Sequence, residues 1–534
     1  MRLTYDGLKD SASWKNAGID LPAYDPQKIA ENTRKNPRWI HFGIGNIFRI
    51  FVGGIADNLI RSGKMDTGII CAESFDYDVV DKIYHPFDNL ALAVTLHEDG
   101  KTDKRVLASL TEAVKAPQDR ARLTEIFTAK TLQLVSFTIT EKGYALHGSD
   151  GKYFPFVEAD MTNGPANPKG AMAIITAMLY ERFKAGAFPL ALVSMDNVSQ
   201  NGRKLRESVI ETAKKWHEKN FVPSEFVAYV EDEKRVAFPW TMIDKITPRP
   251  SEDVAKMLTG LGVDDMNIVV TSKRTYIAPF VNAEAPGYLV IEDSFPNGRP
   301  ELEASNFGVY MADRKTVNLS ERMKVTACLN PIHSALCTYA IMLGYTLFAD
   351  AMHDAELSKL AHTVGYAEGL PVVEDPKIIS PSKFLDECMN VRFPNPYLGD
   401  TSARIATDIS QGLGIRFGET VKEYVSRDGT AKNLTGIPLA IAGWLRYILA
   451  VDDSGKKYEL SPDPMNDEMT QKLSGVEIGK PESVGEKLKP ILSNAHIFGV
   501  NLYEAGIGEK IESIFRDEIC GYGAVRETLK KYLA

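Results

Sequence analysis

Short apolar runs that alternate with helical patterns place the strongest constraint on the N-terminal half of this chain. The apolar runs are Trp39–Gly43, Gly68–Ala72, Leu132–Thr140 and Leu190–Met195. Between the first two, Asn46–Arg61 carries apolar residues at the three- and four-residue spacing of a helix. Strands separated by helices favour an α/β fold with a mostly parallel, doubly wound sheet. Because ligands of such folds lie at the carboxyl ends of the strands, the residues that follow each run are candidate site residues.

The C-terminal half has helical patterns instead. Ser334–Leu347 is apolar nearly all round, which predicts a buried central helix, and Asn433–Val451 and Gly508–Phe515 predict further helices. The Gly- and Pro-rich segment Glu284–Pro300 is the expected crossover between the two halves, with Tyr288–Ile291 as a possible extra strand.

Composition excludes several classes of function. The 534 residues include 62 Lys+Arg and 71 Asp+Glu, a formal net charge of −9, and no basic run, so nucleic-acid binding is not expected. The apolar stretch Ser334–Ala349 is shorter than the ~20 residues of a membrane span, and the N-terminus lacks the apolar core of a signal peptide. Five scattered Cys without a C-x-x-C pair, and nine His without H-E-x-x-H, argue for a cytoplasmic protein with reduced thiols and no metal.

The segment GIGNIF follows the first predicted strand and resembles a dinucleotide-binding loop. Gly43 permits a tight turn, and Gly45 lets the backbone approach a pyrophosphate at the helix N-terminus. Asn46 and Ile47 complete the loop, while Phe48 holds the place of the usual third glycine. Since two glycines after a strand are often only a turn, this motif alone leaves both interpretations open.

An acidic residue at the end of the second strand strengthens the cofactor interpretation. Glu73 lies 30 residues after Gly43, where a carboxylate can accept hydrogen bonds from both adenosine ribose hydroxyls and repel a 2′-phosphate. It therefore favours NAD over NADP; an exposed loop acid is the alternative, and Asp76 is the fallback partner. Asp196 and Asn197 follow the fourth strand, where substrate would meet nicotinamide.

Eight motifs in fixed order make the chain resemble the polyol-specific long-chain dehydrogenase/reductase (mannitol dehydrogenase) family. They are LPAYD (Leu21–Asp25), GIGNIFR (Gly43–Arg49), TITEKGY (Thr138–Tyr144), MDNVSQNG (Met195–Gly202), FPWTMIDKITP (Phe238–Pro248), ERMK…LNPIH (Glu321–His333), RFPNPYLGDTSARI (Arg392–Ile405) and GAVRETL (Gly523–Leu529). The resemblance implies a Rossmann-like NAD-binding domain, residues 1–295, and a mainly α-helical substrate and catalytic domain, residues 296–534. It also implies zinc-independent hydride transfer between NAD(H) and a sugar ketone or secondary alcohol.

The resemblance assigns roles to particular residues. The family's catalytic lysine falls on Lys324, its carboxamide pair on Asn197 and Asn330, and its substrate histidine on His333. Further implied residues are Asp244 near cofactor and substrate, Arg404 in contact with substrate, and Glu321 as a proton relay.

These assignments agree with what ketone reduction requires. A lysine whose pKa is lowered by burial can donate the proton, and two amides can polarise the carbonyl. His333 lies three residues after Asn330 and can hold a neighbouring hydroxyl. On spacing alone, Glu321 and Lys324 also fit an ordinary salt bridge on a helix surface, and His333 also fits a histidine of the core.

The spacing around the lysine departs from the family. Lys324 precedes Asn330 by six residues instead of five, and on a straight helix Lys324 and His333 would face opposite sides. A π-bulge, or a break at Pro331, can absorb the extra residue. We therefore predict an irregularity between Met323 and Pro331.

A second departure concerns the substrate. Gly412 stands where many relatives carry a lysine, and Arg416 is the candidate replacement. A sugar acid requires a cation near its carboxylate, for which Arg404, Arg392, Arg416 and Arg49 are available.

The N-terminal extension and the chain length resemble the branch of the family that interconverts D-fructuronate and D-mannonate. A neutral polyol such as mannitol, or tagaturonate, is the alternative substrate. A non-catalytic NAD-binding sensor is the alternative of a different class. The family resemblance is compatible with a monomer or a small homo-oligomer.

Overall fold

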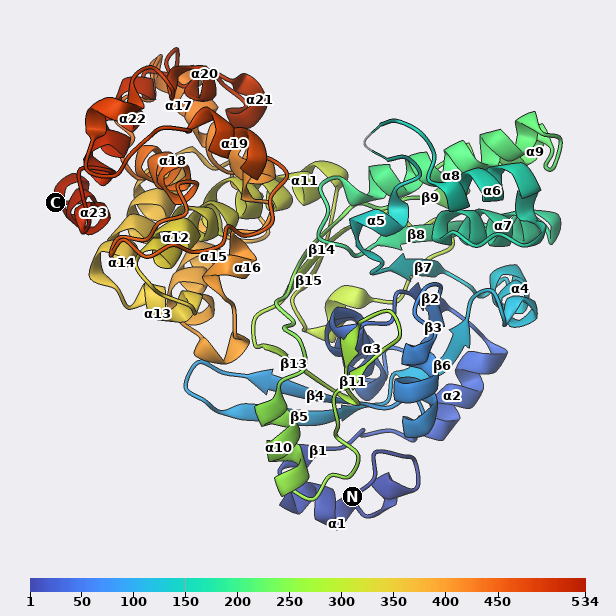
Figure 1. Ribbon diagram of the computed structural model, residues 1–534. Helices are drawn as coiled ribbons and strands as arrows, with labels where there is room; N and C mark the ends of the chain where they lie inside the picture. The colour runs from blue at the N-terminus through green and yellow to red at the C-terminus, as the bar shows by residue number, and fades with distance from the viewer. Residues whose placement is uncertain (149) are drawn as a thin grey trace. The chain divides into compact units, whose positions relative to one another are not determined.

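The computed structural model describes residues 1–148 and 150–534, which form two compact units, Met1–Asn318 and Leu319–Ala534 (Figure 1). The first unit continues past residue 295 because β15 (Val309–Ala312) pairs in parallel with β14 (Tyr288–Glu292). The possible strand at 288–291 is therefore present, as β14.

A six-stranded sheet forms the centre of the first unit, and all its neighbouring strands are parallel. In spatial order the strands are β6 (Leu110–Lys115), β3 (Ile69–Glu73), β2 (Trp39–Phe42), β7 (Leu134–Phe137), β8 (Leu190–Ser194) and β9 (Val236–Ala237). Numbered along the chain, these six strands follow the order 3-2-1-4-5-6 of the Rossmann fold, which places the switch point between β2 and β7. The four predicted strands and their parallel arrangement are confirmed.

Helices cover both faces of this sheet. Ile40 and Phe42 of β2 belong to one hydrophobic core, whereas Trp39 belongs to the other. The first core is closed by α4 (Arg120–Thr128), α7 (Ala171–Lys184) and α8 (Asn201–Glu218), and the second by α3 (Gly53–Arg61). The strand residues are buried from both sides, which explains why their sequences are continuous apolar runs.

Two further sheets and a two-stranded hairpin, β11 (Val269–Val270) with β12 (Tyr276–Ile277), complete the first unit. One is mixed, in the order β1 (Ile19–Asp20), β5 (Thr102–Leu107), β4 (Ala91–Leu96) and β13 (Phe280–Glu284). The other contains β10 (Thr241–Asp244), β14 and β15.

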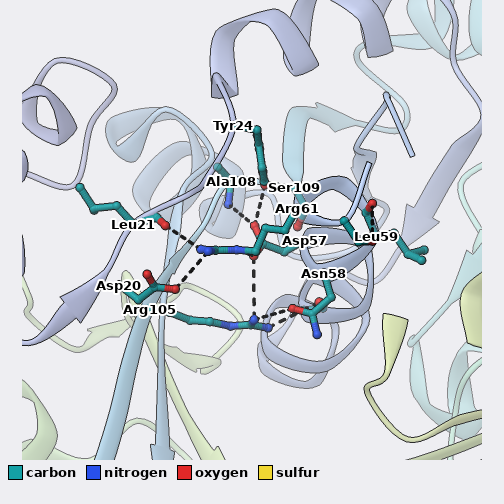
Figure 2. A network of polar contacts seen from close by, with 12 residues as sticks. Asp20, Leu21, Tyr24, Asp57, Asn58, Leu59, Arg61, Arg105, Ala108 and Ser109 are labelled. Atoms are coloured by element: carbon teal, nitrogen blue, oxygen red, sulfur yellow. Dashed lines mark hydrogen bonds and ion pairs between the residues drawn. The ribbon is translucent and has the colours of Figure 1, made fainter. Parts of the chain in front are cut away.

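A buried ion-pair network ties α3 to β1 and β5 (Figure 2). Asp57 is fully buried and accepts hydrogen bonds from Arg61 Nε at 2.6 Å and from the Tyr24 hydroxyl at 2.6 Å. Arg105 of β5 lies 3.9 Å from the same carboxylate, and Arg61 also pairs with Asp20 of β1 at 3.1 Å. The LPAYD motif therefore has a structural function, because its tyrosine satisfies a buried carboxylate.

The second unit is helical, and every named strand of the described residues lies before residue 319. Its centre contains α12 (Asn330–Met342), α18 (Gly436–Tyr447) and α22 (Gly508–Glu518), with α18 packed against both others. The three predicted helices are confirmed, although α12 ends before Gly344, whose positive φ of 87° terminates it. Within the described ranges, no helix has the length and apolar character to cross a bilayer.

Candidate functional site

The loop after β2 has the geometry of a phosphate-binding turn. Gly43 adopts φ +87°, and a Cβ there would lie 2.1 Å from the Thr138 carbonyl oxygen of β7's end, so only glycine fits. A Cβ at Gly45 would have no heavy atom within 4 Å, so the backbone at this position is open to a ligand. The first glycine is required by the protein itself, and the second leaves the space that a pyrophosphate needs.

The helix that follows is anchored by buried side chains. Phe48, which replaces the third glycine, is fully buried and stacks on the His41 ring at 4.0 Å. Arg49 is 1% exposed and donates to Asn46 Oδ1 at 2.8 Å and to the Ala278 carbonyl at 2.7 Å. Burial lowers the pKa of Arg49 to about 10. Arg49 therefore positions the loop, and a role toward a substrate carboxylate stays a prediction. Ile47 is partly buried against the core.

Glu73, at the end of β3, is 7% exposed, so the alternative of an exposed loop acid is wrong. Its Oε1 accepts the backbone N–H groups of Ser74 at 2.9 Å and Phe75 at 2.8 Å, and the carboxylate also bonds the Ile44 N–H. Burial raises the pKa of Glu73 despite these bonds. Glu73 thus joins the loops after β2 and β3, and a role toward ribose stays a prediction.

Asp76, the fallback ribose partner, faces the hairpin of β11 (Val269–Val270) and β12 (Tyr276–Ile277). Its Oδ2 accepts the hydroxyls of Thr271 and Thr275, each at 2.6 Å. These bonds give Asp76 a structural function in holding the hairpin.

A polar chain at the switch point was not foreseen from the sequence. His41 is fully buried, and its ring nitrogens lie 2.6 Å from Ser136 Oγ and 2.9 Å from Thr138 Oγ1. The Thr138 hydroxyl donates to the Gly43 carbonyl at 2.6 Å, so the chain ends at the candidate phosphate loop. Burial holds the pKa of His41 well below its usual value and keeps the ring neutral. The signal available in the sequence was polar residues inside strands that are otherwise apolar.

The two polar residues that follow β8, Asp196 and Asn197, have different environments. Asp196 accepts the Ile139 N–H at 2.9 Å and the Tyr144 hydroxyl at 2.6 Å, and burial raises its pKa. It therefore fixes the end of β7 to that of β8. Asn197 is exposed. Asn201, which sequence reasoning missed, donates to Thr241 Oγ1 at 2.8 Å and joins β8's end to β10.

Asp244 is the last residue of β10, where it lies opposite Tyr288 of β14, and it is 8% exposed. The first unit thus carries Gly43, Gly45, Glu73, Asn197 and Asp244 on the loops and strand ends of one Rossmann-type scaffold.

The predicted irregularity before Pro331 is present in the second unit. A π-helical segment, η7 (Lys324–Cys328), begins at Lys324. Its C-cap residue Leu329 has a φ of −127°, which interrupts the helix before α12 starts at Asn330. The wider turn accommodates the additional residue between Lys324 and Asn330, and such segments are frequent at functional sites.

The side chains around this segment are enclosed. Lys324 is 2% and Glu321 is 9% exposed, so the alternative of an ordinary surface salt bridge is wrong. Asn330 Oδ1 is buried and has no hydrogen-bond partner among the described residues, which leaves an acceptor for a ligand. The His333 ring packs edge-on against Phe348 at 4.8 Å and tilted against Phe393 at 4.7 Å.

The two arginines expected to contact substrate differ in environment. Arg404 is exposed and forms an ion pair with Asp400. Arg392 is 3% exposed at the end of the π-helical segment η10 (Cys388–Arg392), with its guanidinium carbon 5.9 Å from the centre of the Phe384 ring.

The last feature of the site is the arrangement of the side chains that commonly bind metals. Among the described residues, no group of three or more His, Cys, Asp or Glu side chains is arranged to hold a metal ion.

Comparison with known proteins identifies the scaffold. The Mannitol dehydrogenase Rossmann domain matches residues 37–304, and the Mannitol dehydrogenase C-terminal domain matches residues 317–515. A D-mannonate oxidoreductase of Thermotoga maritima is 52% identical over 535 aligned positions, covering 99% of each chain.

Two solved structures share the fold. A substrate-free D-sorbitol dehydrogenase superposes with a TM-score of 0.79 at 24% identity, over 96% of this chain and 98% of that one. The Pseudomonas fluorescens mannitol 2-dehydrogenase in a ternary complex with NAD and D-mannitol gives 0.73 at 24% identity, over 100% and 99%. The two matched domains together cover most of the sequence, and the chain belongs to the mannitol dehydrogenase family.

Proposed function

We propose that this protein is an NAD-dependent, zinc-independent oxidoreductase that interconverts D-fructuronate and D-mannonate. The observation that carries the proposal is the 52% identity, along the entire chain, to a protein named D-mannonate oxidoreductase. The proposal includes a cytoplasmic location and a small-molecule sugar-acid substrate.

The residues at the switch point fit NAD. The turn at Gly43, the open backbone at Gly45 and the N-terminus of the following helix suit a pyrophosphate, with Asn46 and Ile47 in the same loop. The Glu73 carboxylate suits the ribose hydroxyls and opposes a 2′-phosphate, which favours NAD over NADP. When bound, NADH supplies the hydride for the ketone, and NAD⁺ accepts it in the reverse direction.

The protein's side chains supply the proton and hold the substrate. In ketone reduction, the Lys324 ammonium donates a proton to the oxygen of the substrate carbonyl as negative charge develops there. The Asn197 and Asn330 amides donate hydrogen bonds to that oxygen, and His333 holds an adjacent hydroxyl. Glu321, one helical turn before Lys324, returns a proton to the lysine from solvent.

Asp244, Arg404 and Arg392 complete the proposed substrate-binding set. The aspartate can accept hydrogen bonds from sugar hydroxyls, and the two arginines can donate hydrogen bonds to sugar oxygens.

A substrate panel tests the proposal. Purified protein is mixed with NADH and D-fructuronate, D-tagaturonate or D-fructose, and with NAD⁺ and D-mannonate or D-mannitol, while cofactor absorbance is followed. Turnover of D-fructuronate and D-mannonate, with much lower kcat/KM for the neutral sugars, is expected. A preference for D-mannitol or D-tagaturonate would instead assign the protein to the branch of the family that uses that substrate. Cofactor binding without turnover of any substrate would support a sensor.

A further inference from the structure

Arg416 is a partly buried cation that has no acidic partner among the described residues. It lies in the π-helical segment η13 (Gly414–Gly418), and its Nη1 donates to Ser334 Oγ at 2.7 Å. No carboxylate of the described residues forms an ion pair with it, and burial lowers its pKa. Removing a cation from water is costly unless an anion or several acceptors compensate it. Among the described residues, the Ser334 hydroxyl is the one acceptor of its five N–H donors, which leaves the others for a ligand.

The position of this guanidinium depends on a glycine. Gly412 ends the 3-10 helix η12 (Ile409–Gly412), and a Cβ at that residue would lie 2.4 Å from Arg416 Nε and 2.6 Å from its Cζ. Any larger residue at 412 would displace the guanidinium. The absence of a side chain at 412 and the presence of an arginine at 416 are thus one structural feature.

This guanidinium lies beside the helix that carries the proposed chemistry. Its partner Ser334 directly follows His333 in α12, and η13 packs against both α12 and η7, the segment that begins with Lys324. All of these elements belong to the second unit. Two solvent-facing arginines of this region already have acidic partners: Arg404 pairs with Asp400, and Arg322 pairs with Glu419.

We propose that Arg416, in the space left by Gly412, binds the carboxylate of the sugar-acid substrate and excludes neutral polyols. This inference rests on the proposed function, because it names the residue that distinguishes D-fructuronate and D-mannonate from fructose and mannitol. The carboxylate lies at the far end of the carbon chain from the reacting ketone, so Arg416 binds and orients the substrate and takes no part in proton transfer. A guanidinium matches a carboxylate with two parallel hydrogen bonds.

Three variants test the proposal: Arg416→Met, Arg416→Lys and Gly412→Ala. Arg416→Met is expected to raise KM for D-mannonate about 10- to 100-fold, because a charge-assisted hydrogen bond to the substrate is lost. The change in kcat should be smaller. Arg416→Lys keeps the charge and should give an intermediate KM. Gly412→Ala keeps the arginine but moves it, and should raise KM in the same direction. NADH affinity, measured by fluorescence titration, should stay unchanged in all three.

A binding measurement separates this inference from the proposed function. D-mannonate should raise the melting temperature of wild type more than D-mannitol does, and Arg416→Met should remove that difference. The matched control is Arg427→Met, which alters an exposed arginine paired with Asp428 and should behave as wild type.

The inference would be overturned if Arg416→Met had the KM for D-mannonate of an active wild type and the same melting-temperature shift on adding D-mannonate. The proposed function would then still stand. If Arg416→Met does not fold, an unchanged KM in Gly412→Ala and Arg416→Lys overturns it equally. Wild type that is inactive on both sugar acids would instead overturn the proposed function, and the melting shift would still decide the role of Arg416.

Discussion

At the residue scale, Lys324 carries the proton-transfer proposal. Lys324→Ala should lower kcat by about 10²- to 10⁴-fold, the usual contribution of a general acid, while NADH affinity changes little. Steady-state kinetics and NADH fluorescence titration provide the two readings. Lys315→Ala, which alters an exposed lysine of α11 (Arg314–Met323), is the control and should retain activity. Loss of NADH binding in Lys324→Ala would indicate a structural lysine.

The two loop glycines should respond differently to the same substitution. Gly43→Ala places a Cβ against the Thr138 carbonyl oxygen and keeps alanine in a left-handed backbone conformation. It should therefore lower the melting temperature markedly. Gly45→Ala enters open space, so the melting temperature should stay near that of wild type while NADH affinity falls about tenfold or more. Thermal unfolding and NADH titration separate the two effects. Equal NADH affinity in Gly45→Ala and wild type would contradict the assignment of this loop.

At the scale of elements, the Asp57 network decides how α3 is attached to its sheet. Asp57→Asn leaves Arg61 and Arg105 beside a neutral group and should lower the free energy of unfolding of the first unit by about 3–5 kcal/mol. Denaturant unfolding measures the change. Asp20→Asn removes only an exposed partner of Arg61 and should cost less than about 1 kcal/mol. Equal effects of the two substitutions would contradict a special contribution from the buried carboxylate.

At the scale of the whole molecule, Glu518 couples stability to pH. It is fully buried in α22, accepts the Tyr339 hydroxyl of α12 at 2.5 Å, and burial raises its pKa from 4.5 to about 8. Between these values the folded chain keeps a proton that the unfolded chain has released, so this group's contribution to stability falls as pH rises from about 4.5 to about 8. The slope is at most about 1.4 kcal/mol per pH unit.

Glu518→Gln should flatten this part of the profile, because glutamine does not titrate. Melting temperatures of both proteins across the same pH range provide the measurement. An identical fall in wild type and Glu518→Gln would assign the pH dependence to other groups.

The sequence determined those features that depend on neighbouring residues. The apolar runs, their helical intervals and the Gly43 turn are local patterns, and the structure has the strands and the parallel sheet that they predict. The irregularity before Pro331 was also predictable, since one additional residue between Lys324 and Asn330 has to be accommodated in the helix. The catalytic roles come from the family resemblance and not from these local patterns.

Only the tertiary structure decided burial and pairing. It made Arg49 an internal anchor and Glu73 a junction between two loops, and it placed Arg416 in the space beside Gly412, bonded to Ser334. A residue's type is written in the sequence, but its hydration and its partners are set by segments far away in the chain. Because desolvation and nearby charge determine what an ionisable group can do, the selection of substrate depends on that folded environment.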